Sequence, residues 1–392
     1  MRKIIYSLLA MVCFGPVIAQ QNLHELLQEI EANNTGYKAQ QSLVEAQQLE
    51  NRVGNVPANP QLEGGYLWGS PSAVGNRKDF SVTQEIDFPT VYHHQRKLAD
   101  LRDRQAEMTA DQYRLELRIE AAQLWVELVC LNRKIDIGKE RTTLAKKLAD
   151  AYEQRLAVGD ANRIDRNKAA LNALQSEKHL HRLEQERELL LLNLFALNGN
   201  QPVAVETREF APVELAPDFE HRLAELLQQS PRSKWYALQS EASDREVKLY
   251  QSKKLPRISG GYMLENTVGE KFQGVTLGLS IPLWENKNTV KAARLRQQAG
   301  ALEQEDFQLH YKAEMTRLAR SVQLNAARVE ELRRELAKIE QQELLKEALD
   351  AGHLSLIDYL LEMQFNYEVE DQLLESERDL QLAWTQLKVL EN

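Results

Sequence analysis

The segment PQLEGGYLW occupies residues 60–68, and a segment of the same character, PRISGGYML, occupies residues 256–264. Both alternate apolar residues with small or polar ones, and both carry Gly-Gly-Tyr at the same position. Alternation with a period of two is typical of a β-strand. The recurrence predicts that each half of the chain contributes the same kind of strand, within a sequence that otherwise reads as helical.

The repetition extends well beyond these two segments. Phe88-Pro89 aligns with Ile281-Pro282, and VGDANRID at 158–165 aligns with AGHLSLID at 351–358, in both cases with an offset of 193 residues. A constant offset indicates an internal repeat, and each copy reads helix, β-hairpin, long helix, helix. We therefore predict a first repeat at 21–197, a linker at 198–220 and a second repeat at 221–392, with helical tips near 158–164 and 351–356.

Four strands are predicted, about 60–69, 79–88, 256–265 and 273–283. Each is about the length of a transmembrane β-strand, which needs roughly ten residues, and one face of each is apolar. Four strands cannot close a barrel, since even the smallest barrels have about eight, so several chains must contribute. The alternative is a pair of soluble hairpins lying on a helical core.

Two stretches without proline follow the hairpins, from Val91 to about Val158 and from about Asn286 to Asp350. Helices of roughly 65 residues span about 100 Å, which is longer than a globular core can bury. The first carries two adjacent apolar seams, which would require a neighbour on each side, as in a tube of helices. The seams are Leu117, Ala121, Leu124, Leu128, Leu131 and Ile135, and Leu115, Ile119, Ala122, Val126 and Val129. A helical bundle or rod is the alternative, but it does not explain the strands.

The first twenty residues place Arg2 and Lys3 ahead of an apolar run that ends at Val17-Ile18-Ala19, which predicts a secretory signal peptide at 1–20. Its removal would change the formal charge from −9 to −11, and such an acidic exported chain is unsuited to binding nucleic acid. The longest apolar run after it, LLLLNLFAL at 189–197, is about half the ~20 residues of a membrane-spanning helix. Strands, tube-forming helices and secretion together predict an α+β membrane protein, with a β-barrel in the outer membrane continued by an α-helical barrel.

The duplicated plan, the strand-to-helix segment IPLWENKN at 281–288, and the turns VGDANRIDR at 158–166 and AGHLSLIDY at 351–359 together resemble the TolC-type outer-membrane efflux channels. The resemblance covers essentially the whole mature chain. It implies a homotrimer in the outer membrane of a Gram-negative bacterium, with a twelve-strand barrel in the lipid and a helical tunnel in the periplasm. It also places the linker at 198–220 in the equatorial region of the tunnel.

The resemblance further implies partners: a periplasmic adaptor protein and an inner-membrane pump at the tunnel tip. The segments ANPQ at 58–61 and FPTVYHHQRK at 88–97, with the short chain, are similar to the branch that serves heavy-metal cation exporters of the resistance-nodulation-division class.

Two turns hold the candidate site residues. Gly159 and Gly352 are expected to end helices in the left-handed conformation, and Asp165 and Asp358 to lie in the first turns of the returning helices. An acid there interacts favourably with the helix dipole by ~0.3 to 1 kcal/mol, which is a purely structural role. The resemblance implies adaptor contacts at both tips: Val158, Gly159, Asp165, Gly352, Ser355 and Asp358.

The resemblance also implies an acidic pore constriction in the second copy. Asp358 matches the first acidic position of the family pattern, while the second position falls on Leu361. Glu362 follows directly and is the residue expected to replace it, although a shift of one residue rotates a side chain by about 100° around a helix. We therefore expect Asp358 and Glu362 to form the constriction.

No enzymatic chemistry is predicted. The histidines, His93-His94, His179 and His181, are not spaced to share one helix face as metal ligands, and the sequence has no nucleophile elbow or phosphate loop. We expect no catalytic, cofactor or metal site. The sequence predicts a passive exit duct for a pump located elsewhere, and a soluble periplasmic coiled-coil scaffold or adaptor-like protein is the alternative.

Overall fold

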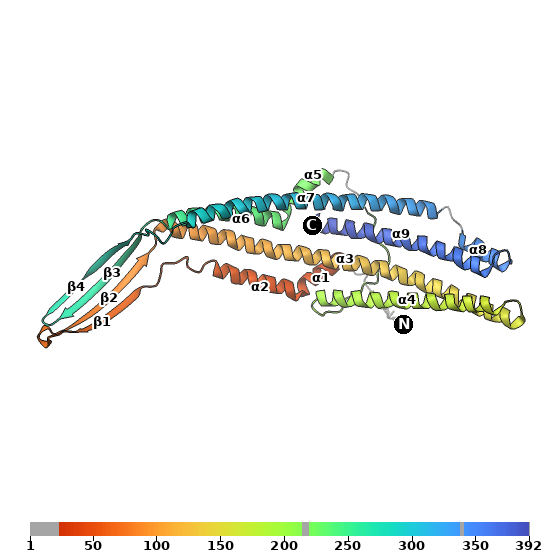
Figure 1. Ribbon diagram of the computed structural model, residues 1–392, viewed down its shortest axis with the longest axis horizontal. Helices are drawn as coiled ribbons and strands as arrows, with labels where there is room; N and C mark the ends of the chain where they lie inside the picture. The colour runs from red at the N-terminus through yellow and green to blue at the C-terminus, as the bar shows by residue number, and fades with distance from the viewer. Residues whose placement is uncertain (1–22, 214–218, 338–340, 392) are drawn as a thin grey trace, which may run out of the picture. The chain divides into compact units, whose positions relative to one another are not determined.

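The computed structural model describes residues 23–213, 219–337 and 341–391 (Figure 1). The predicted signal peptide at 1–20 and residues 214–218 of the predicted linker lie outside the described residues.

Helices and strands follow one another in a similar order in both halves of the chain, with two helices after the strands in the first half and three in the second. The first half contains α1 (Leu23–Asn33), α2 (Thr35–Glu50), β1 (Gln61–Trp68), β2 (Asn76–Ile86), α3 (Pro89–Val158) and α4 (Arg163–Leu197). The second contains α5 (Phe219–Gln229), α6 (Pro231–Ser252), β3 (Arg257–Thr267), β4 (Glu270–Ser280), α7 (Thr289–Leu336), α8 (Gln341–Asp350) and α9 (Leu356–Glu391). A 3₁₀ turn, Ser72–Val74, lies in the β1–β2 loop.

Residue contacts divide the chain into two compact units. Unit 1 contains the described residues of Met1–Asn33, Glu120–Val213 and Asn325–Leu382, and unit 2 those of Asn34–Ile119, Glu214–Leu324 and Ala383–Asn392. The long helix α3 passes through both, and the sheet belongs to unit 2.

Unit 2 ends in an antiparallel sheet of order β1-β2-β3-β4 (Figure 1). The central pair joins the two halves of the chain, since β2 pairs with β3 from Lys78 opposite Asn266 to Ile86 opposite Ile258. All four connections to helices leave one end of the sheet, and the β1–β2 and β3–β4 loops lie at the other, the loop end. Below the sheet, the start of α3 packs on α6 through a cluster that contains Val91, Leu98 and Leu238.

Unit 1 is helical. Its part of α3 packs against α4 through Leu131, Ile135 and Leu183, and polar groups attach the extended stretch after α4 to α3. Asn132 Nδ2 donates to the carbonyl oxygens of Val205 at 2.8 Å and Thr207 at 3.0 Å. Because Val205 is also buried, the linker near residues 205–207 packs against α3.

The predicted strands and the first long helix agree with the structure to within three residues. In unit 1 the two predicted seams of α3 are both occupied, as Ala121, Leu128 and Leu131 of one and Ala122, Val126 and Val129 of the other are buried. The second long helix was predicted to run unbroken to Asp350, and this is wrong, because the structure has α7 ending at Leu336 and a separate α8 beginning at Gln341.

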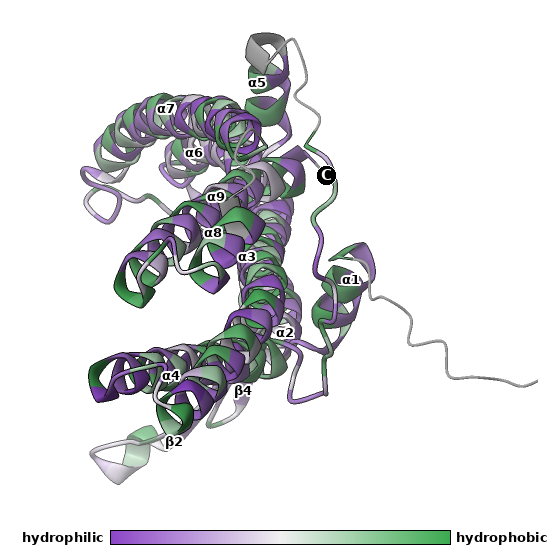
Figure 2. Ribbon diagram, turned by 90° about the vertical axis from the view of Figure 1, so that its right-hand side faces the viewer, coloured by the Kyte–Doolittle hydropathy of each residue, from purple (hydrophilic) through white to green (hydrophobic). Residues whose placement is uncertain are grey.

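Along the helices, hydrophilic and hydrophobic residues are mixed (Figure 2). Among the described residues no helix combines the length and the apolar character that crossing a membrane requires.

Candidate functional site

The first candidate feature is the apolar face of the sheet. Paired residues on neighbouring strands have their side chains on the same face, so the printed register sorts the four strands into two faces. One row across the sheet is Leu62, Val82, Tyr262 and Val275, and the rows beside it add Phe80, Leu264, Ile86, Ile258, Leu277 and Leu279. Most apolar positions of the four strands thus share one face, while Leu67, Met263 and Phe272 lie on the other.

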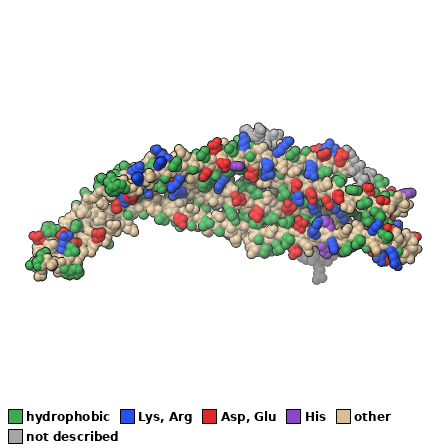
Figure 3. Space-filling model, in the orientation of Figure 1, with side chains coloured by type: hydrophobic (Ala, Val, Ile, Leu, Met, Phe, Trp, Pro, Cys, Tyr) green, Lys and Arg blue, Asp and Glu red, His purple; other side chains and the backbone are tan. Residues whose placement is uncertain are grey.

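That face is uncovered in the single chain. Val275 is 83% exposed and Leu277 is 86% exposed, and hydrophobic side chains are visible at the surface near the loop end of the sheet in Figure 3. Within the described residues, β1 and β4 each pair along one side only, so the sheet has two open edges. An exposed apolar patch marks a site of contact with other protein or with membrane, and an unpaired edge can accept a further strand.

The opposite face carries all the carboxylates of the strands, together with Arg77 and Arg257. Near the loop end, Arg77 Nε lies 2.7 Å from Asp79 Oδ1 and 3.1 Å from Glu265 Oε1. At the helix end, Arg257 lies 3.5 Å from Glu85 and also contacts Glu285. Ion pairs on one face and aliphatic side chains on the other are the arrangement of a strand with lipid on one side and water on the other.

The second candidate feature is the turn between α3 and α4. Val158 is the last residue of α3 and is exposed, and Gly159 has φ of +83°, which confirms its predicted left-handed conformation. Asn162 caps α4 by accepting from the backbone N–H of Asp165 at 2.9 Å, and it donates to Asp165 Oδ2 at 2.7 Å. The carboxylate of Asp165 therefore helps to close the first turn of α4.

The turn before α9 is built in the same way. Gly352 has φ of +74°. Ser355 Oγ accepts from the backbone N–H of Asp358 at 3.2 Å and donates to Asp358 Oδ2 at 2.6 Å. Both predicted acids thus lie in first turns, as expected, and both belong to side-chain capping pairs.

The structure brings the two turns together in unit 1. A small core of Tyr152 on α3, Ala169 on α4 and Leu356 on α9 joins them, with Leu360 packed beside it. The six predicted tip residues consequently gather at one end of this unit around an apolar contact, and all of them are exposed except Asp165, which is half-buried.

Asp358 and Glu362 are four residues apart on α9 and therefore lie on the same face of the helix. Both are exposed, as are Leu361 and Phe365 beside them. An i,i+4 pair is offset by only ~40°, so the two carboxylates share a face, while Glu362 lies ~100° around the helix from Leu361.

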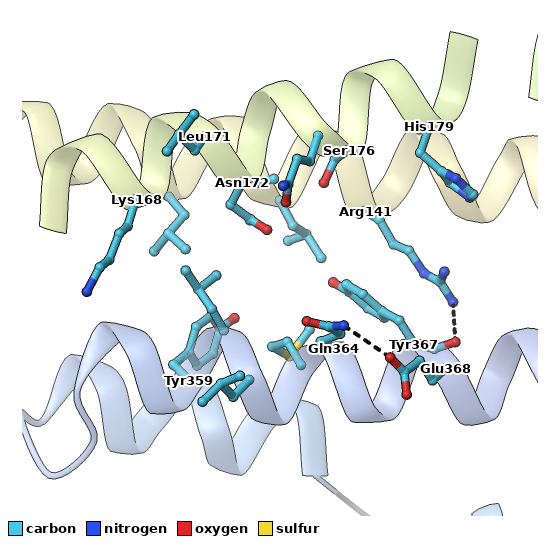
Figure 4. A pocket seen from close by; sticks show the side chains of 18 of the residues that line it. Arg141, Lys168, Leu171, Asn172, Ser176, His179, Tyr359, Gln364, Tyr367 and Glu368 are labelled. Carbon is cyan, nitrogen blue, oxygen red and sulfur yellow. Dashed lines mark hydrogen bonds between the residues drawn. The ribbon is translucent and has the colours of Figure 1, made fainter. Parts of the chain in front are cut away.

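A groove between α4 and α9, floored by α3, is a feature that the sequence analysis missed. Its volume is about 580 Å³, and Leu144, Leu171 and Leu361 form part of its apolar lining. Figure 4 shows Lys168, Asn172 and His179 on one side and Tyr359, Gln364 and Tyr367 on the other. No local pattern in the sequence points to this groove, since its three walls are far apart along the chain.

Arg141 closes one end of the groove by joining α3 to α9 (Figure 4). Its Nη1 donates to Asp371 Oδ1 at 2.9 Å, its Nη2 donates to Glu370 Oε2 at 2.8 Å, and its guanidinium carbon lies 4.2 Å from the centre of the Tyr367 ring. The side chain is only 12% exposed. Such a partly buried, multiply bonded arginine holds two helices in one relative position.

Burial raises the pKa of Tyr367 to about 12. A tyrosine whose pKa is higher in the folded state than its ordinary value near 10 stabilises the fold below pH 10, and this contribution is lost as the pH rises toward 12. We expect the melting temperature of the wild type to fall more steeply between pH 10 and 12 than that of Tyr367→Phe. Tyrosinate absorbance should show one group fewer titrating near pH 12 in the variant, and identical curves would contradict this assignment.

The described residues contain no group of three or more His, Cys, Asp or Glu side chains placed to hold a metal ion. His93 and His94 lie edge to face with ring centres 5.4 Å apart, and burial lowers the pKa of His179, which favours its neutral form.

Comparisons with known proteins return matches by structure alone. No protein-family model and no curated protein match the sequence. The outer-membrane protein VceC of Vibrio cholerae is 16% identical, with a TM-score of 0.73 over 94% of this chain and 94% of VceC. The outer-membrane channel CmeC of Campylobacter jejuni is 17% identical, with a TM-score of 0.72 over 95% of this chain and 85% of CmeC.

CusC, a protein that forms a transmembrane channel, is 15% identical, with a TM-score of 0.72 over 95% of this chain and 92% of CusC. Identities this low identify a fold and leave substrate and partners open. The chain has the fold of the TolC-type outer-membrane channels.

Proposed function

We propose that this protein is the outer-membrane exit duct of a tripartite efflux system in a Gram-negative bacterium. Three copies would place twelve strands in the outer membrane as a closed barrel and extend their helices into the periplasm as a tunnel. Substrate would be driven by an inner-membrane pump of the resistance-nodulation-division class and delivered through a periplasmic adaptor. The protein itself would perform no catalysis and bind no cofactor.

The observation that carries this proposal is the sheet. In the described part of the chain its apolar face is uncovered, its opposite face is ion-paired, and both of its edges are open. In lipid every backbone polar group must be satisfied by protein, so a sheet with open edges must be closed by strands from other chains. The structural similarity to VceC, CmeC and CusC supports the same arrangement.

The repeated order of elements supports a further part of the proposal, that the two halves are copies of one unit at 21–197 and 221–392, with 198–220 in an equatorial position. Heavy-metal cations are the proposed cargo. The resemblance of ANPQ and FPTVYHHQRK to that branch supports this choice.

Membrane fractionation with chemical crosslinking tests the proposal. We expect the chain in the outer-membrane fraction, extracted only by detergent, as a heat-sensitive trimer. Recovery of the chain in the aqueous periplasmic fraction without detergent would contradict the proposal and support the soluble coiled-coil scaffold instead.

The two tips are proposed as the adaptor contacts, and Asp358 with Glu362 as the pore constriction. Three copies of each carboxylate around a narrow axis would favour cations and limit conductance. In planar bilayers, Asp358→Ala with Glu362→Ala is expected to raise single-channel conductance and to lower the cation-over-anion permeability ratio several-fold.

Asp165→Ala is the matched control, since Asp165 has the same capping role in the first-copy turn. It is expected to leave conductance and selectivity near the wild-type values. Unchanged currents in the double variant, or equal changes in the control, would contradict the proposal that Asp358 and Glu362 form the pore constriction.

A further inference from the structure

Two lysines occupy the apolar face of the sheet at its loop end. Lys78 on β2 pairs with Asn266 on β3, which pairs with Lys271 on β4, so the three side chains form one row across the sheet. Tyr66 on β1 pairs with Lys78 and extends this row. The row lies on the same face as Val82 and Val275. Each lysine is four residues from the valine of its own strand, in the direction of the loops.

These lysines are the only charged residues of the described strands on this face. By the same register the carboxylates of the strands fall on the opposite face: Glu63, Asp79, Glu85, Glu265 and Glu270. Two of those acids already bind Arg77. Within the described part of the chain no acid pairs with Lys78 or Lys271, and both side chains are exposed.

Aromatic side chains mark the depth of this row. The Lys78 ammonium lies 5.7 Å from the centre of the Tyr66 ring, Tyr66 Oη accepts from Asn76 at 2.7 Å, and Trp68 beyond it is 80% exposed. Tyr and Trp gather at the boundary between lipid tails and headgroups, where a lysine on the lipid face costs far less than at the bilayer midplane. The row therefore suits the headgroup level.

The spacing of the two charges suits phosphates. Lys78 and Lys271 are separated by one strand, which places them about 10 Å apart. An anion at this level must come from the lipid, since the face is open to the bilayer. In a Gram-negative outer membrane the leaflet at the loop end contains phosphorylated glycolipid.

We propose that Lys78 and Lys271 bind the phosphate groups of the outer-leaflet glycolipid, an inference that rests on the proposed function for the orientation of the sheet. Tyr66 and Trp68 would contact the sugar and the upper acyl chains. Each trimer would hold three such sites around the rim of its barrel.

Native mass spectrometry of the full chain, released from vesicles, tests this. One set of vesicles contains phosphatidylcholine with bisphosphorylated lipid A, and the other contains the same lipid A without phosphates. A lysine near an anionic surface contributes about a fivefold preference, so the wild type is expected to retain phosphorylated lipid A roughly 25-fold better. Lys78→Gln with Lys271→Gln should remove most of this preference.

Lys254→Gln with Lys287→Gln is the matched control. Both residues are exposed lysines at the helix end of the sheet, and their loss is expected to leave the preference unchanged. Equal retention of the two lipids by the wild type, or an unchanged preference in the Lys78 and Lys271 variant, would overturn the lipid site alone. Failure of the wild type to enter either vesicle would overturn the proposed function with it.

Discussion

Leu277→Arg is expected to abolish insertion of the protein into the outer membrane, whereas Thr276→Arg, one residue away, is expected to insert normally. Leu277 lies in the middle of the apolar face, in a row with Gly260 and Gln84, and is almost fully exposed. Thr276 lies on the opposite face across from Gly261, which has no side chain to obstruct a larger residue.

The size of the effect follows from depth in the bilayer. An arginine on the lipid face of a barrel at the midplane costs about 2 to 4 kcal/mol, and three chains would bear that cost three times. The same arginine on the water-facing side costs little. The measurement is the yield of detergent-extracted, heat-sensitive oligomer in the outer-membrane fraction, compared between the two variants.

This pair of variants separates the membrane account from its rival. If the sheet were a soluble structure resting on helices, the two substitutions on this exposed strand would have similar, small effects. Equal yields would therefore contradict the assignment of the two faces, and a loss confined to Thr276→Arg would reverse it.

Arg141→Ala is expected to release α9 from α3. The substitution removes three hydrogen bonds to two carboxylates and the contact with the Tyr367 ring. Breaking a buried ion pair costs about 3 to 5 kcal/mol. Glu370 and Asp371 are each more than one-third exposed, which reduces the expected cost to about 2 kcal/mol.

Amide hydrogen exchange measures this local opening. A cost of 2 kcal/mol corresponds to exchange roughly thirtyfold faster in α9 near residues 359–371, with little change in the sheet. Lys139→Ala is the control, because Lys139 is exposed and its nearest acid, Asp136, lies 4.0 Å away. Equal protection of α9 in Arg141→Ala and in the wild type would show that the apolar contacts alone hold α9 on α3.

The strands and the turns were predictable because their determinants are local. A period of two in Val275, Leu277 and Leu279 shows which side of the strand is apolar, whatever the strand pairs with. Gly159 and Gly352 have left-handed backbones that glycine adopts without steric cost, and the polar residue and the acid that follow form a capping pair within three residues.

Contacts between distant segments could not be predicted in this way. Arg141 meets Asp371 across 230 residues, and buried Glu377 on α9 accepts from Arg133 of α3 and Arg333 of α7. In sequence each of these residues is one more charge on a highly charged helix. Only the packing of the helices makes them partners.

Helix ends inside a continuous pattern were also beyond the sequence analysis. The stretch from Asn286 to Asp350 has no proline, and its helix propensity is high throughout, so an unbroken helix was the natural prediction. The structure ends α7 at Leu336, just after Arg333 binds Glu377. Helix propensity takes no account of tertiary contacts such as this one, and it therefore does not predict this helix end.

The central claim is that one chain supplies only four strands of a β-barrel and that three chains together close the barrel in the membrane. Native mass spectrometry of the full chain in lipid nanodiscs measures this most directly. The account predicts a single species of three chains that keeps its lipid and falls to one chain only on heating. A stable single chain that remains in aqueous buffer without lipid or detergent would contradict it.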